Sequence, residues 1–176
     1  MIATKRVLNI GCGEDLYGTD FIDLYPSRPE VVKCNVDKEK IPYKNNTFDE
    51  VYSKCLFEHL TNPLFALKEM HRVLKTGGKL VLITDNAACF YFHFKSLGKF
   101  YLEHYGGHEG KGPEDKHFAL FTPEHLKNWM FKTGFKKIEI TYHNPYSKRF
   151  IVIFKKILQK ISPKYFSLHL KVIAIK

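Results

Sequence analysis

The alternation of apolar and polar residues along this chain predicts seven strands separated by turns and helices. Each strand is a short run rich in β-branched and aromatic residues, and Gly, Pro, Asn or Asp residues bound most of the runs. The predicted strands are Arg6–Ile10, Asp20–Leu24, Val31–Val36, Thr47–Ser53, Lys79–Thr84, Lys136–Tyr142 and Ser167–Ile175.

The helices are predicted by the residues that begin and end them. Asn62-Pro63 and Thr122-Pro123 each place a capping residue before a proline at the first helical position. Gly77-Gly78 and Gly134 mark the ends of these two helices. Strands that alternate with helices in this order predict an α/β fold with a doubly wound, mostly parallel sheet. Two further segments have helical spacing, Phe90–Tyr105 and Phe150–Ile161.

Composition is consistent with a single domain over residues 1–176. The chain is 44% hydrophobic and has four scattered cysteines without a C-x-x-C pair, which favours reduced thiols and a cytoplasmic location. The net charge of +10 is local, because the segment from Ile140 to Lys176 holds eight Lys and Arg and no Asp or Glu. The basic segment therefore needs an explanation of its own.

Polar and glycine residues follow several of the predicted strands. Gly11 and Gly13 follow the first strand, and Asp23 and Asp37 follow the second and third. Ligands of open α/β sheets bind at the carboxyl ends of the strands, where a carboxylate can accept hydrogen bonds from a ribose diol. We therefore expect a nucleoside-containing cofactor. The G-x-G-x-x-G and G-K-[ST] motifs are missing, which favours S-adenosylmethionine, an adenosine cofactor without phosphate.

The motifs "VLNIGCGE", "NVDKEKIPYKNNTFDEVYS", "LFEHL" and "ALKEMHRVLKTGGKLVLIT" occur in this order. Together they resemble the class I S-adenosylmethionine-dependent methyltransferases. The resemblance implies the Rossmann-like sheet of that family with an antiparallel last strand, and S-adenosylmethionine as cofactor. It also implies these cofactor-binding residues: Asn9, Gly11, Cys12, Gly13, Asp23, Leu24, Val36, Asp37, Ser53, Lys54 and Cys55.

The first crossover departs from the family pattern. Only nine residues separate Ile10 from Asp20, whereas a parallel crossover usually needs about a dozen. We expect the first crossover helix to be reduced or lost.

Candidate catalytic residues follow the fourth strand and precede the helix predicted at Thr122-Pro123. Glu58, His59 and His117 are the candidate bases for an acceptor hydroxyl or amine. Pocket lining by His59, without catalysis, is the alternative. Metal-dependent members of the family carry a further Glu where this chain has Cys55, so no metal site is predicted here. The loop 103–117, which holds His104 and His108, is expected to be solvated rather than metal-binding, within an acceptor-side lid at 87–121.

The basic segment 143–166 predicts an amphipathic insertion between the last two strands. Lysines interleaved with Ile and Phe favour contact of residues 148–164 with an anionic membrane surface. The expected function is methyl transfer to a small or lipid-linked acceptor. Two alternatives remain, an RNA methyltransferase that uses the basic segment and a cofactor-binding module without catalysis. Acceptor identity and oligomeric state stay open.

Overall fold

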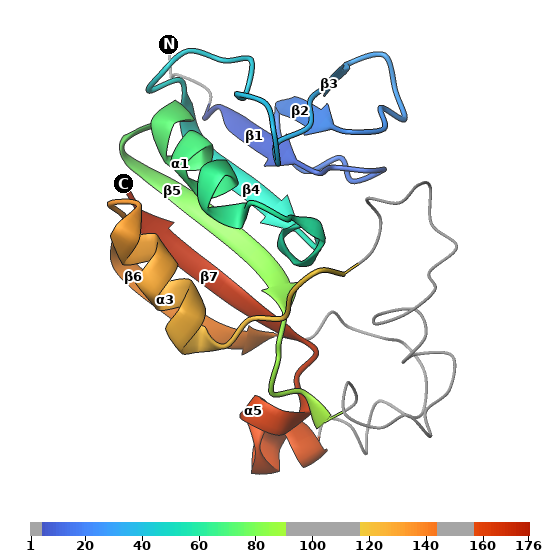
Figure 1. Cartoon of the computed structure of the whole chain (residues 1–176), viewed down its shortest axis with the longest axis vertical. Helices are drawn as coiled ribbons and strands as arrows, with labels where there is room; N and C mark the ends of the chain where they lie inside the picture. The colour runs from blue at the N-terminus through green and yellow to red at the C-terminus, as the bar shows by residue number, and fades with distance from the viewer. Residues whose placement is uncertain (1–4, 91–116, 144–156) are drawn as a thin grey trace.

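Seven strands form one sheet in the order β3-β2-β1-β4-β5-β7-β6 (Figure 1). The computed structural model describes residues 5–90, 117–143 and 157–176. All seven predicted strands are confirmed, with changes in their ends. Their bounds are β1 Val7–Ile10, β2 Asp20–Asp23, β3 Val31–Lys33, β4 Phe48–Lys54, β5 Leu74–Asp85, β6 Lys136–His143 and β7 His169–Ile175.

The sheet is mostly parallel, as predicted. β1 pairs in parallel with both β2 and β4, and β4 pairs in parallel with β5. β7 is antiparallel to both of its neighbours, β5 and β6. The carboxyl ends of β1, β2, β3 and β4 therefore meet at one edge of the sheet, where the sequence placed its glycines and carboxylates.

The crossover from β1 to β2 contains no helix. Residues 11–19 form turns and bends, and both ends of the segment are bonded to the strands, since Gly11 N donates to Ile22 O at 2.9 Å and Thr19 N donates to Val7 O at 2.9 Å. The expected loss of the first crossover helix is confirmed. Within this segment, the ring of Tyr17 packs against that of Tyr52 on β4, with centroids 4.7 Å apart.

Helix α1 (Pro63–Val73) ends earlier than predicted. Leu74 is fully buried and pairs with Phe48 at the start of β5. Burial of Leu74 against the sheet therefore ends the helix before the Gly77-Gly78 pair is reached, and the prediction of that end was wrong. The side chain of Asn62 makes no capping bond. Thr122 caps α3 (Pro123–Lys132) as predicted, because its side chain accepts from His125 N.

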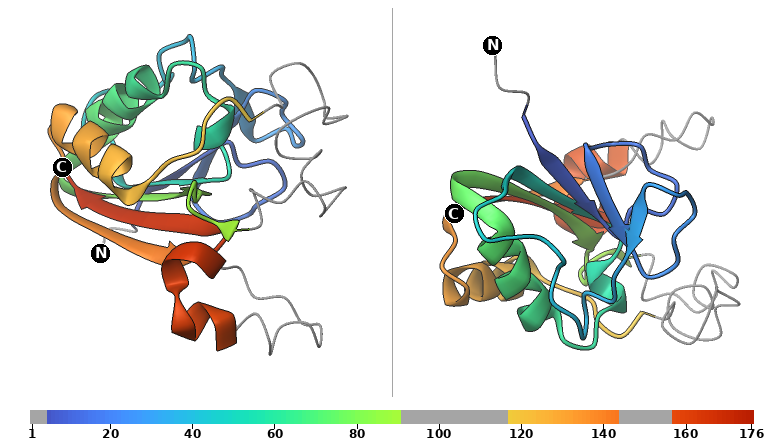
Figure 2. Two further views of the ribbon diagram at one scale, coloured as in Figure 1. Left: turned by 60° about the horizontal axis from the view of Figure 1, so that its bottom comes forward. Right: turned by 90° about the horizontal axis from the view of Figure 1, so that it is seen from above.

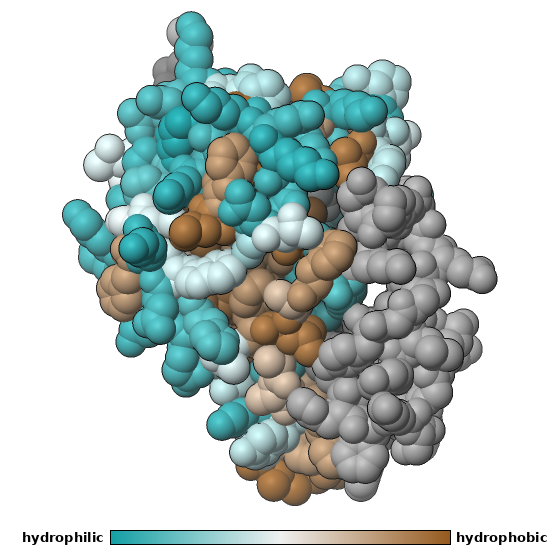
Figure 3. All heavy atoms as spheres, viewed as in Figure 1, coloured by the Kyte–Doolittle hydropathy of each residue, from teal (hydrophilic) through white to brown (hydrophobic). Residues whose placement is uncertain are grey.

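Two further short helices are the 3-10 helix η1 (Phe57–His59) after β4 and α5 (Pro163–Phe166) before β7. Residues 157–161 are also helical, which confirms the end of the predicted helix Phe150–Ile161. Figure 3 shows apolar residues at the end of the molecule where Figure 1 places α5. No helix within the described ranges is long and apolar enough to cross a bilayer.

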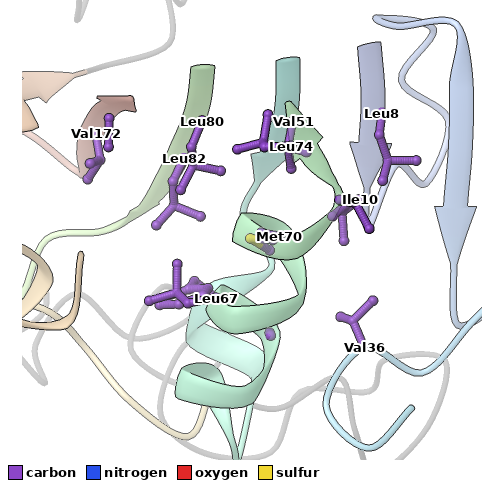
Figure 4. Close-up of a cluster of buried hydrophobic side chains, with 14 of the residues drawn as sticks. Leu8, Ile10, Val36, Val51, Leu67, Met70, Leu74, Leu80, Leu82 and Val172 are labelled. Atoms are coloured by element: carbon purple, nitrogen blue, oxygen red, sulfur yellow. The ribbon is translucent and has the colours of Figure 1, made fainter. Parts of the chain in front are cut away.

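The main core lies between the sheet and helices α1 and α3, which cover the same face (Figure 2). Leu67 and Met70 of α1 point toward strand residues such as Val51 and Leu80 (Figure 4). All four side chains are fully buried, and each such aliphatic side chain contributes about 1.5–3 kcal/mol. This core fixes α1 and η1 beside the carboxyl ends of β1 and β4.

Some predictions fall outside the described residues. The helix predicted at Phe90–Tyr105 does so almost entirely, and His104 and His108 do so completely. The predicted lid at 87–121 and the basic insertion at 143–166 are described only at their ends.

Candidate functional site

A cavity of about 280 Å³ opens at the carboxyl ends of β1, β2 and β3 and is closed on its other side by η1 and the residues that follow it. This is the edge at which α/β sheets bind their ligands. The lining residues are Gly11, Ile22, Asp23, Leu24, Cys34, Asn35, Val36, Asp37, Lys38, Leu56, His59, Leu60, Thr61 and Phe118.

Asp23 ends β2 and holds the turn after β1 in place. Its Oδ2 accepts from Gly13 N at 2.8 Å, and its Oδ1 accepts from Tyr25 N at 2.8 Å. A carboxylate oxygen has more than one acceptor position. The Asp23 carboxylate is therefore oriented by the backbone and can still accept hydrogen bonds from a ligand in the cavity.

Asp37 connects the segment after β3 to the start of α1. Its Oδ1 accepts from Asn62 N at 2.6 Å, and its Oδ2 accepts from the Thr61 hydroxyl. The carboxylate, and not the Asn62 side chain, thus satisfies a backbone donor near the helix start. The same contact closes the cavity, since Asp37 and Thr61 both line it.

The two glycines after β1 have different surroundings. Both adopt positive φ, +67° at Gly11 and +51° at Gly13, which a side chain disfavours. A Cβ at Gly11 would lie 3.0 Å from the Leu56 side chain, whereas a Cβ at Gly13 would meet nothing within 4 Å. Gly11 lines the cavity and, because it has no side chain, leaves space for Leu56, while Gly13 donates its N–H to Asp23.

Six of the eleven residues predicted to bind the cofactor do not line the cavity. Asn9 donates from its side chain to Tyr17 O, which connects β1 to the segment that follows it. Ser53 donates from its hydroxyl to Ile10 O, which connects β4 to the end of β1. Cys12 is buried, and Gly13 acts through Asp23. Lys54 and Cys55 are exposed at the end of β4.

Several lining residues were missed by the sequence reasoning. Asn35, Thr61 and Phe118 come from loops, where no periodic pattern marks the side that faces a ligand. Asn35 lies two residues before Asp37, Thr61 lies two residues after His59, and Phe118 follows His117 directly. Their closeness to predicted residues was the only available signal.

The three candidate bases gather at the η1 side of the cavity. Their nitrogen and oxygen ligand atoms lie within 4.8 Å of one another. His59 lines the cavity, and its ring packs edge-on against that of His117 with centroids 4.5 Å apart. Glu58 is buried behind them, and its Oε2 accepts from the Thr84 hydroxyl at 2.6 Å.

Burial sets the charge state of Glu58. Desolvation, with the nearby carboxylate of Asp85 as a second cause, raises the pKa of Glu58 to about 7. Asp85, at the end of β5, is a group that sequence reasoning missed. It is 2% exposed, with Oδ2 3.1 Å from His117 Nδ1 and Oδ1 3.5 Å from His169 Nε2.

Among the described residues, Glu58, His59 and His117 are also the group whose spacing could hold a metal ion. Cys55 is not part of this group. Its Sγ lies 3.8 Å from His169 Nε2. The predicted lack of a metal site stays a prediction.

Comparisons with known proteins agree with this arrangement. A family model described as a methyltransferase domain matches residues 2–140. The demethylmenaquinone methyltransferase of Oceanobacillus iheyensis is 30% identical over 129 residues, which cover 67% of this chain and 52% of that protein. The ubiquinone biosynthesis O-methyltransferase of Nitrosococcus oceani is 25% identical and covers 85% of this chain and 72% of that protein. The chain spans about half the length, or less, of the first curated relatives that it matches.

Solved structures show the same fold. An S-adenosylmethionine-dependent methyltransferase from Archaeoglobus fulgidus superposes with a TM-score of 0.65 at 21% identity, covering 98% of this chain and 86% of that one. Phosphoethanolamine N-methyltransferase 2 of Haemonchus contortus, solved with S-adenosylmethionine, has a TM-score of 0.62 at 18% identity and covers 98% of this chain and 48% of that one. The sheet order, the cavity at the carboxyl ends and the matching family model together show that this chain belongs to the methyltransferase-domain family and has the class I S-adenosylmethionine-dependent methyltransferase fold.

Proposed function

We propose that this chain transfers the methyl group of S-adenosylmethionine to a small-molecule acceptor. The observation that carries the proposal is the pairing of two features at one cavity. Asp23 and Asp37 lie on its wall beside β2 and β3, and His59 lies on its wall at η1, in contact with His117. The two aspartates could bind a nucleoside, and the two histidines could accept a proton from the methyl acceptor.

The cavity has the donors, acceptors and apolar surface that the adenosyl group requires. Asp23 would accept from the ribose hydroxyls, and Asp37 would accept from the exocyclic amine of adenine. Leu24 and Val36 supply apolar lining, which an adenine ring needs. At Gly11, a side chain would press on the Leu56 wall. These residues fit the cofactor. The cavity, at about 280 Å³, is slightly smaller than the range of about 300–1,000 Å³ that is typical of small-molecule sites.

The sulfonium of the bound cofactor supplies an electrophilic methyl group and a neutral thioether leaving group. The methyl group would pass to the acceptor atom, and the electron pair of the broken carbon–sulfur bond would stay on sulfur. A hydroxyl or amine acceptor must also lose a proton. Alignment of the two reacting atoms is the main contribution of the protein.

His59 and His117 are the proposed proton acceptors. Their rings are in contact, and His59 lies on the cavity wall. Glu58 is buried beside them with a raised pKa, so it can hold a proton near neutral pH. We propose that the protonation state of Glu58 affects the charge of His59 and His117 through electrostatic interaction, and that Glu58 does not contact the acceptor.

A phenolic or quinol ring is the proposed acceptor class. The support is that one relative is named a demethylmenaquinone methyltransferase and another a ubiquinone biosynthesis O-methyltransferase. Phe118, which follows His117 directly, gives the cavity an aromatic surface on the η1 side. The segment 87–121 would then flank the acceptor.

Methyl transfer can be tested with tritiated S-adenosylmethionine and demethylated quinols that carry short or long isoprenoid tails. Label in the quinol fraction supports the proposal. Tight binding of S-adenosylhomocysteine without transfer to any quinol or phenol would favour the catalytically silent module. Transfer to RNA, with binding that falls steeply as salt rises, would favour the RNA methyltransferase.

A lipid-linked acceptor would lie in a membrane, and one surface fits contact with it. Ile157, Ile161 and Tyr165 are 51%, 73% and 49% exposed. Lys160 and Lys164 lie within the same short stretch. Apolar side chains beside lysines favour an anionic bilayer surface, where each lysine adds about 1 kcal/mol.

Vesicle co-sedimentation tests this surface. We expect binding to anionic vesicles at low salt, release at high salt, and little binding to neutral vesicles. Ile161→Asp should weaken binding, whereas Phe131→Asp, which alters an exposed apolar residue of α3 (57% exposed), should not. Equal loss in both variants would contradict a specific surface.

A further inference from the structure

Asp85 joins three parts of the chain at the carboxyl end of β5. It pairs with His169 in the β5–β7 register, and its Oδ1 lies 3.5 Å from His169 Nε2. Its Oδ2 lies 3.1 Å from Nδ1 of His117, in the segment before α3. Asp85 is only 2% exposed. Burial of a carboxylate costs free energy unless polar groups, here the two imidazoles, lie close enough to offset the loss of water.

The segment that carries His117 is also fixed from the η1 side. Glu58 O accepts from Phe118 N at 2.7 Å and from Ala119 N at 3.3 Å. The backbone directly after His117 is thus bonded to η1, while the His117 ring faces Asp85. The backbone bonds to η1 fix the position of the segment, and in that position Asp85 lies close to the His117 ring.

These contacts form a continuous path from the cavity into the protein. His59 lines the cavity, His117 packs edge-on against His59, and Asp85 Oδ2 lies 3.1 Å from His117 Nδ1, a close polar contact without the geometry of a hydrogen bond. In a neutral imidazole, the charge of a carboxylate near Nδ1 favours the proton on that nitrogen and leaves Nε2 as the acceptor. Nε2 is the ring nitrogen farther from Asp85.

We propose that Asp85 is a positioning residue for methyl transfer, which holds His117 in the tautomer that accepts a proton at Nε2. The inference rests on the proposed function. As the acceptor oxygen or nitrogen bonds to the methyl carbon, its proton passes to Nε2 of His117, directly or by way of His59. The nearby Asp85 carboxylate then stabilises the imidazolium ion.

Other titratable groups face this pair and share its environment. They are Glu58 on η1, His169 on β7, His59 at the cavity and Cys55 at the end of β4, whose Sγ is 3.8 Å from His169. Burial raises the pKa of Glu58, whereas Asp85 is the carboxylate whose oxygen lies 3.1 Å from His117 Nδ1. The hydrogen bond from Thr84 keeps Glu58 Oε2 occupied.

The tautomer of His117 can be measured without any acceptor. Nitrogen-15 spectra of the full chain, assigned with His117→Gln, report which ring nitrogen carries the proton. The wild-type protein should show a single neutral tautomer with the proton on Nδ1. Asp85→Asn should lose that preference, and Asp85→Glu should restore part of it.

A matched control is Glu69→Gln. Glu69 is another buried carboxylate, 6% exposed, but it bonds Arg72 on α1. The control should keep the His117 tautomer, even if its stability falls. A tautomer that is unchanged in Asp85→Asn would overturn the inference. So would stoichiometric Mn²⁺ binding that broadens the His59 and His117 signals, because Nε2 would then be a metal ligand.

Kinetics give the second readout. Asp85→Asn should lower kcat by about 100-fold, the lower end of what a positioned base contributes, with little change in KM for the cofactor. The same change in a His117→Gln background should add little, since the two residues act as a unit. If the wild type methylates no acceptor, the proposed function fails. If it does and Asp85→Asn retains the wild-type kcat, only the positioning role fails.

Discussion

Replacement of Asp23 by Asn should weaken cofactor binding more than it weakens the fold. Both oxygens of the carboxylate accept backbone N–H groups, from Gly13 and from Tyr25, each at 2.8 Å. Whichever way the new amide turns, its NH₂ group faces one of these two donors. The variant therefore loses the charged acceptor for the ribose diol and also disturbs the turn that shapes the cavity.

The size of the effect follows from these bonds. A hydrogen bond to a charged group contributes about 1.5–3 kcal/mol. Loss of one such bond to the ribose corresponds to a Kd that is about 10-fold to 150-fold weaker. The disturbed turn should lower the free energy of unfolding by about 1–3 kcal/mol, the penalty of one unsatisfied donor.

The assay is calorimetric titration with S-adenosylhomocysteine, and Asp20→Asn is the control. Asp20 begins the same strand at its other end, where it pairs with Arg6 at 2.6 Å outside the cavity lining. The control should lose some stability and keep the wild-type Kd. Equal affinity of wild type and Asp23→Asn, or equal loss in both variants, would refute the role of the β2 end.

Three further changes test other parts of the structure. Gly11→Ala should weaken S-adenosylhomocysteine binding more than Gly13→Ala. Both substitutions place a side chain at a residue with positive φ, but only the Cβ at position 11 would meet a cavity wall, at 3.0 Å from Leu56. Equal effects of the two substitutions would contradict this. Because the pKa of Glu58 is raised in the folded protein, to about 7, folding takes up a proton and the free energy of unfolding should fall as pH rises from about 4.5 to about 7. Glu58→Gln should flatten that dependence in urea titrations across this range, and an unchanged slope would show that the group is not protonated on folding. Tyr17→Phe removes the hydroxyl that donates to Glu50 Oε1 at 2.7 Å, so unfolding should become easier by about 1–3 kcal/mol while the S-adenosylhomocysteine affinity stays unchanged.

Local patterns predicted the sheet well. Every predicted strand forms, because each is a run rich in β-branched and aromatic residues that is bounded by turn residues. The nine-residue gap before Asp20 correctly indicated that no crossover helix fits. The end of α1 was wrong because tertiary burial of Leu74 overrode the local signal of Gly77-Gly78.

The candidate site was predictable only where it follows strand order. Asp23 and Asp37 end or follow strands, so the parallel topology brings them to one edge, and both line the cavity. Asp85 also ends a strand, but its partners His117 and His169 come from distant segments. No spacing in the sequence reveals a contact that depends on β7 lying antiparallel beside β5.

The central claim is that the cavity at the carboxyl ends of β1, β2 and β3 holds the adenosyl group, with the reacting sulfur on the side of η1. A crystal structure of the full chain with S-adenosylhomocysteine tests it most directly. The account predicts ribose hydroxyls within about 3 Å of the Asp23 carboxylate, adenine beside Val36 and Asp37, and sulfur on the side of His59. A ligand bound elsewhere, or bound in this cavity with its sulfur turned away from His59, would contradict the account.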